Sequence, residues 1–126
     1  MIRVPDKGRF ELRLMDGAAN PYLLQAGGIA AGLHGIDNKI DPGEPLSCNM
    51  YTDYKNYPNL KKLPDTIEDA LKQLESSKEI IKAFGHDTID SYLKLKRSEI
   101  ENFNQNERFD KKSSVTHWEK NSTLDC

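Results

Sequence analysis

The sequence predicts an α+β fold in which one or two N-terminal strands are followed by three or more helices. Residues 9–14 alternate charged and apolar side chains, which is the period of a strand with one buried face. Apolar residues recur at helical spacing over 67–84 and again over 89–103. With 30% charged and 37% hydrophobic residues, a chain of 126 residues is expected to have a modest core.

The first predicted element is a strand within residues 1–16. Residues 2–5 are expected to be extended. Residues 6–8 are Asp-Lys-Gly, which are typical of a turn, so we expect a hairpin-like arrangement before the strand. On the strand, Arg9, Glu11 and Arg13 share one face and can form the wall of an active site. From spacing alone, ordinary cross-strand ion pairs, worth about 0.2–1 kcal/mol each, are the commoner reason for such a pattern.

A helix is predicted over residues 20–36. Asn20 can cap it, and Pro21 suits its first position. Its apolar residues predict a mostly buried helix, and its glycines, which cost roughly 1 kcal/mol each relative to alanine, predict close approach of a neighbouring element. The sequence therefore implies a larger body around this helix.

Residues 37–64 are predicted to be a loop, because prolines, Asn and Asp are frequent there. Its tyrosines are expected to pack.

Residues 65–104 are predicted to form a pair of helices, the first opened by a capping box of Asp65 with Glu68 and stopped by Gly85. The second should start near residue 87 or 88. The polar tail, 105–126, is expected to dock through Trp118.

Composition excludes several classes of function. The formal net charge of −2 argues against a nucleic-acid-binding protein, because such proteins need a clustered basic surface. No apolar run is long enough to span a membrane, and residues 1–5 lack the hydrophobic region of a signal peptide, so we expect a cytoplasmic protein. Cys48 and Cys126 have no CxxC spacing and are expected to be reduced. The three histidines show no metal-binding spacing.

Several short motifs follow one another in a characteristic order. An Arg-x-Glu-x-Arg strand at 9–13 runs into Gly-Ala-Ala-Asn-Pro-Tyr-Leu-Leu at 17–24, and further motifs follow through Thr-His-Trp-Glu at 116–119. This order and spacing resemble the glutamine synthetase family near its C-terminal end. The ending, residues 122–126, looks like the branch that includes gamma-glutamylmethylamide synthetase relatives. Because full-length members are several times longer, the resemblance implies a C-terminal part of the catalytic domain.

The resemblance also implies an ATP-dependent glutamate–ammonia ligase that uses Mg²⁺ or Mn²⁺. It implies that Arg3 and Arg9 bind ATP, that Arg13 binds the glutamate substrate, and that Glu11 binds metal. Full-length family members are homo-oligomers whose active site lies between subunits and uses the N-terminal domain of the adjacent chain. That domain and most of the metal ligands lie outside this sequence, so this part alone is expected to be inactive. The lysine that approaches the nucleotide in many bacterial members has only a weak counterpart here in Lys7, because the segment after Arg3 is shorter.

The sequence leaves several alternatives open. The acceptor can be ammonia, methylamine or another small amine, because the residues shaping that pocket mostly lie outside this sequence. The chain can also be a non-catalytic interaction module or the remnant of a truncated gene. Tyr51 occupies a position that some bacterial glutamine synthetases modify, but the surrounding Asp-Leu-Pro-Pro-Glu pattern is missing, which favours a packing role.

Overall fold

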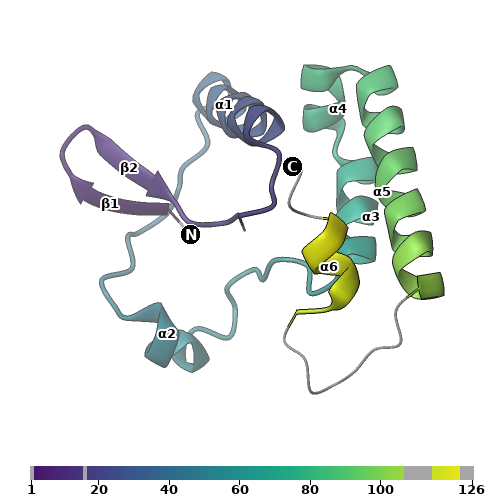
Figure 1. Cartoon of the computed structure of the whole chain (residues 1–126). Coiled ribbons are helices and arrows are strands. Elements are labelled where there is room, and N and C mark those ends of the chain that lie inside the picture. The colour runs from purple at the N-terminus through teal and green to yellow at the C-terminus, as the bar shows by residue number, and fades with distance from the viewer. Residues whose placement is uncertain (1, 16, 107–114, 123–126) are drawn as a thin grey trace. The chain divides into compact units, whose positions relative to one another are not determined.

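A computed structural model describes residues 2–15, 17–106 and 115–122. Within them lie two antiparallel strands followed by six α-helices and one 3-10 helix, which confirms the predicted α+β class (Figure 1). The chain divides into two compact units, one of Met1–Gly27 with Arg97–Cys126 and the other of Gly28–Lys96. None of the helices within the described ranges is long and apolar enough to cross a membrane.

The N-terminal hairpin consists of β1 (Ile2–Asp6) and β2 (Arg9–Leu12). Gly8 turns the chain with a φ of +80°, a conformation that favours glycine. Arg3 pairs with Glu11 and Asp6 pairs with Arg9, so β1 holds one extra residue between these pairs. That stretch contains Pro5, which has no N–H for the ladder, so a bulge there is physically reasonable.

Helix α1 (Pro21–Asp37) begins as predicted, because Asn20 Oδ1 accepts hydrogen bonds from the backbone N–H groups of Tyr22 (3.0 Å) and Leu23 (3.1 Å). The predicted burial is wrong for this chain, since no residue of α1 is buried and Tyr22 and Ile36 are 80% and 74% exposed. The predicted close approach at its glycines is also absent where the structure tests it: a Cβ at Gly27, Gly32 or Gly35 would meet nothing within 4 Å. The sequence pattern describes a helix that needs partners, and the described residues do not supply them.

The segment between α1 and the next long helix is less irregular than predicted. It contains α2 (Met50–Asp53) and the 3-10 helix η1 (Tyr54–Asn56), and Asn49 caps α2 by accepting from the N–H of Tyr51. The expected packing of the tyrosines fails for Tyr51 and Tyr54, which are 86% and 51% exposed. Cys48 is a free thiol with its Sγ 3.5 Å from Met50 Sδ, whereas Cys126 lies outside the described residues.

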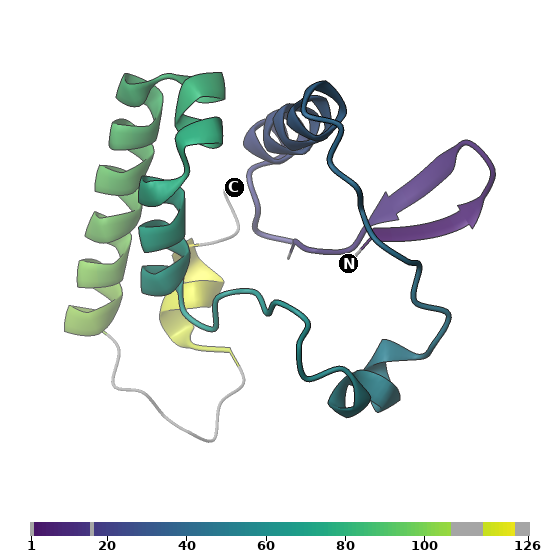
Figure 2. The same cartoon turned by 180° about the vertical axis from the view of Figure 1, so that it is seen from behind.

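The segment predicted to form two helices contains three. They are α3 (Ile67–Ser76), α4 (Lys78–Phe84) and α5 (His86–Asn106). In both views α3 and α4 run alongside α5, and the buried residues Leu71, Ile89 and Leu93 form the core (Figure 2). Ser77 interrupts the first predicted helix, because its Oγ caps α4 by accepting from Ile80 N.

The ends of these helices also correct two details of the prediction. The N-cap of α3 is Thr66 with Asp69, one residue later than the predicted capping box of Asp65 with Glu68. Gly85, at a φ of +84°, ends α4 as predicted. α5 begins at His86, one residue earlier than the first predicted start.

The predicted polar tail contains helix α6 (His117–Ser122), which opens with a capping box that was not predicted. Thr116 Oγ1 accepts from Glu119 N (3.1 Å), and Glu119 Oε2 accepts from Thr116 N (2.6 Å). The pair has the Ser/Thr-x-x-Glu spacing that signals such a box. Trp118 meets Phe103 of α5 edge to face, with ring centroids 5.5 Å apart, which confirms its predicted docking role.

Candidate functional site

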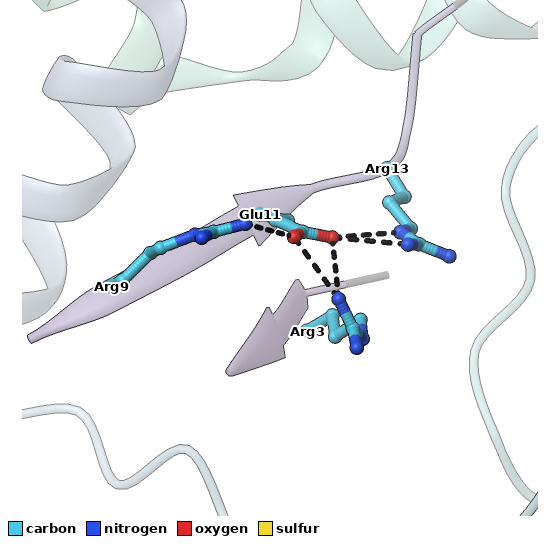
Figure 3. A network of polar contacts seen from close by, with 4 residues as sticks. All are labelled: Arg3, Arg9, Glu11 and Arg13. Carbon is cyan, nitrogen blue, oxygen red and sulfur yellow. Dashed lines mark hydrogen bonds and ion pairs between the residues drawn. The ribbon is translucent and has the colours of Figure 1, made fainter. Parts of the chain in front are cut away.

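Three arginines surround one glutamate on a single face of the hairpin (Figure 3). Glu11 Oε1 accepts hydrogen bonds from Arg9 Nη2 (2.8 Å) and Arg3 Nη1 (3.1 Å). Glu11 Oε2 accepts from Arg13 Nη2 (3.0 Å) and also from Arg3 Nη1 (3.1 Å). We call Arg3, Arg9, Glu11 and Arg13 the arginine cluster.

Strand geometry explains how the cluster assembles. Arg9, Glu11 and Arg13 are two residues apart, so their side chains leave the same face, although Arg13 lies just beyond the end of β2. Arg3 comes from β1 and joins them because it pairs directly with Glu11 across the hairpin. Alternation along one strand therefore predicts three members of the cluster. The fourth, Arg3, depends on both the turn at 7–8 and the extra residue of β1 between Arg3 and Asp6, because the turn alone would place Val4 opposite Glu11.

The cluster has an excess of positive charge, since three guanidinium groups face one carboxylate. The Glu11 side chain is 26% exposed, and the three arginine side chains are 54–64% exposed. Hydrogen bonds from Arg3, Arg9 and Arg13, in that order of effect, lower the pKa of the Glu11 carboxyl below its ordinary value of 4.5. The arginines thus hold Glu11 ionised while remaining accessible to solvent.

We expect a carboxyl ¹³C NMR titration to find Glu11 with a pKa below 4.5 in the folded chain. Because the pKa is lowered only in the folded hairpin, the ion pairs stabilise it fully above the unfolded-state pKa. They are lost as the pH falls through the lower, folded-state pKa. In an Arg3→Gln variant the pKa should move back toward 4.5. A Glu11 pKa at or above 4.5 in the unsubstituted chain would contradict the geometry.

The cluster has the chemistry of an oxyanion site. A guanidinium group carries five N–H donors in a planar fork that matches phosphate and carboxylate oxygens. The cluster aims three such groups at one point, which at present holds the oxygens of Glu11. Phosphate or carboxylate groups of a ligand fit the same donors.

The described residues do not form a complete metal site. They contain no group of three or more His, Cys, Asp or Glu side chains that could hold an ion. Glu11 offers one carboxylate, and both of its oxygens face guanidinium groups. A divalent ion such as Mg²⁺ takes about six oxygen ligands, so Glu11 can be at most one ligand of a site completed by groups outside these residues.

Comparison with known proteins gives a consistent family. Residues 1–119 match the family described as glutamine synthetase, catalytic domain. A glutamine synthetase of Rhizobium meliloti is 45% identical over 125 residues, covering 99% of this chain and 27% of that protein. A glutamate–methylamine ligase of Methyloversatilis universalis is 38% identical over 129 residues, again covering 99% of this chain and 27% of the relative.

A solved structure agrees with this similarity at the level of the fold. It is described as a GmaS/ADP complex in conformation 1, and it is 39% identical to this chain with a TM-score of 0.77. The match covers 100% of this chain and 27% of that one. The chain therefore spans about a quarter of the length of the proteins it resembles.

Proposed function

Because this chain belongs to the glutamine synthetase family, we propose that it forms one wall of the active site of an ATP-dependent glutamate–ammonia ligase. The observation that carries the proposal is the convergence of Arg3, Arg9 and Arg13 around Glu11 on one face of the hairpin. In such a ligase, phosphoryl transfer from ATP activates the γ-carboxylate of glutamate, and ammonia then displaces phosphate. The reaction brings together several oxyanions, whose charge must be neutralised.

Each member of the arginine cluster has a proposed role. Arg3 and Arg9 bind the phosphates of ATP, and Arg13 binds a carboxylate of glutamate, because guanidinium groups make bidentate bonds to both. Glu11 contributes one oxygen ligand to Mg²⁺ or Mn²⁺, and the remaining ligands come from other parts of the catalytic domain. When bound, such an ion stabilises negative charge on phosphate oxygens.

A gamma-glutamyl-amine ligase is the second candidate. Its support is the 38% identity to a glutamate–methylamine ligase, beside the 45% identity to a glutamine synthetase. Both candidates use the arginine cluster in the same way, since they differ in the amine and not in the activation of glutamate. The cytoplasmic location expected from composition, and assembly into homo-oligomers in full-length form, belong to either proposal.

Helix α1 supports the proposal that the chain works inside a larger domain. Residues 21–36 contain no Asp, Glu, Lys or Arg, and none of them is buried. A helix that is apolar on all sides is typical of the interior of a large protein. The remainder of the full-length protein, about three quarters of the length of the relatives, contains the rest of the catalytic domain, which is the body proposed to cover it.

The proposal is tested in a chimera. This chain replaces the matching 125 residues of the Rhizobium meliloti glutamine synthetase, to which it is 45% identical. We expect ATP-dependent ligase activity with glutamate and either ammonia or methylamine. Arg13→Lys should raise the KM for glutamate by about tenfold or more, the factor for losing one charge-assisted hydrogen bond worth about 1.5–3 kcal/mol. The KM for ATP should change much less.

Arg97→Lys on α5 is the matched control, because it makes the same substitution outside the arginine cluster. It should leave both KM values unchanged. A chimera that folds and assembles but has no activity with any amine would contradict the proposed function. Equal effects of Arg13→Lys and Arg97→Lys would contradict the role of Arg13.

A further inference from the structure

The arginine cluster contains more positive charge than a structural ion pair requires. A single arginine suffices to pair with a surface carboxylate, and exposed pairs contribute little to stability. Here three arginines direct N–H groups to the same two oxygens, from 2.8 to 3.3 Å away. No other acidic side chain within the described residues forms an ion pair with them.

The donors that hold Glu11 are the donors that an oxyanion ligand would need. Arg13 uses both Nε and Nη2 on Glu11 Oε2, at 3.3 and 3.0 Å, which is the bidentate side of its fork. Arg9 and Arg3 also point Nη groups at the carboxylate. A phosphate group placed among these donors would meet the negative charge of Glu11 at close range.

We propose that Glu11 is a displaceable internal counterion, which fills the arginine cluster when no ligand is bound and is displaced when a polyphosphate binds. The inference rests on the proposed function in one respect, namely that these arginines bind ligand oxyanions. It adds that Glu11 opposes anion binding in the absence of metal. The arginines and a cation compete for the same two oxygens of Glu11. A cation that binds Glu11 therefore frees the arginines and favours binding of the anion. By the same coupling, a bound anion favours binding of the cation.

The test measures binding of inorganic tripolyphosphate to the 126-residue chain, freed of divalent ions with a chelator that is then removed. Calorimetry at low ionic strength keeps screening of exposed charges small. Glu11→Gln should bind tripolyphosphate about tenfold more tightly than the unsubstituted chain, because it removes one negative charge a few ångströms from the bound anion. Glu79→Gln, in the first turn of α4, makes the same charge change elsewhere and should leave the affinity nearly unchanged.

A second measurement needs no variant. During titration of the unsubstituted chain with tripolyphosphate, the Nε–H NMR signals of the cluster arginines and the carboxyl ¹³C signal of Glu11 should shift with one midpoint. Glu11→Gln binding no tighter than Glu79→Gln would overturn the proposal, as would arginine signals that shift while the Glu11 signal stays. Failure here would leave the ligase activity of the chimera untouched, so the two proposals are tested separately.

Discussion

Alone, the 126-residue chain is expected to make no γ-glutamyl amide from glutamate, ATP and either ammonia or methylamine, with Mg²⁺ or Mn²⁺ present. The reason lies in the ligands available to the metal. Such ions take about six oxygen ligands in octahedral geometry. The proposed ligand among the described residues is Glu11, and these residues contain no group of three or more His, Cys, Asp or Glu side chains that could hold an ion. A single carboxylate that already holds three arginines cannot retain the ion.

Solvent exposure points the same way. The cluster arginines are more than half exposed, so substrates bound there would remain in contact with water. Electrostatic stabilisation of phosphoryl transfer is effective in sites that exclude water.

The measurement compares product formed by this chain with product formed by its Glu11→Ala variant under the same conditions. We expect equal, background amounts from both. Product from the unsubstituted chain clearly above that of the variant would show that a quarter of the family's length suffices for catalysis, which the structure gives no reason to expect.

The hairpin and its charged face were largely predictable because their information is local. Alternation at 9–14 fixes which side chains share a face. The turn at Gly8 pairs Asp6 with Arg9, a register that on its own would bring Arg3 opposite Leu12. The extra residue of β1 shifts the register so that Arg3 pairs with Glu11, and alternation and turn signals do not predict that shift. The roles of these residues were not predictable from spacing, since the same pattern describes an ordinary ionic sheet surface. They came from the resemblance, and they remain proposals.

The burial of α1 was mispredicted because burial depends on partners and not on the helix's own sequence. Its apolar composition correctly describes a helix that needs covering, yet the described residues leave Ile29 and Leu33 exposed. The break at Ser77 was missed for a different reason. Apolar residues keep helical spacing across it, and a serine whose hydroxyl caps the next helix is a weak signal inside such a pattern.

In the chimera with the Rhizobium meliloti enzyme, Glu11→Ala is expected to lower kcat by roughly 10²–10³-fold or more, the scale of removing one preorganised electrostatic group from a transition state. The proposed cause is loss of a metal ligand. The apparent Mn²⁺ dissociation constant should therefore rise together with the loss of turnover. Glu79→Ala on α4 is the control, because it removes an exposed carboxylate far along the sequence from the cluster and should leave both quantities unchanged.

This result separates the two roles proposed for Glu11. In the metal-free chain its removal should strengthen binding of a polyphosphate, because the arginines lose their internal counterion. In the assembled enzyme its removal should strongly lower turnover, because the carboxylate is then needed for the cation. A Glu11→Ala chimera with unchanged turnover and unchanged Mn²⁺ affinity would remove the metal role. Glu11 would then act only as a counterion. In that case a Glu11→Gln chimera should bind nucleotide more tightly than the unsubstituted chimera and should retain its turnover.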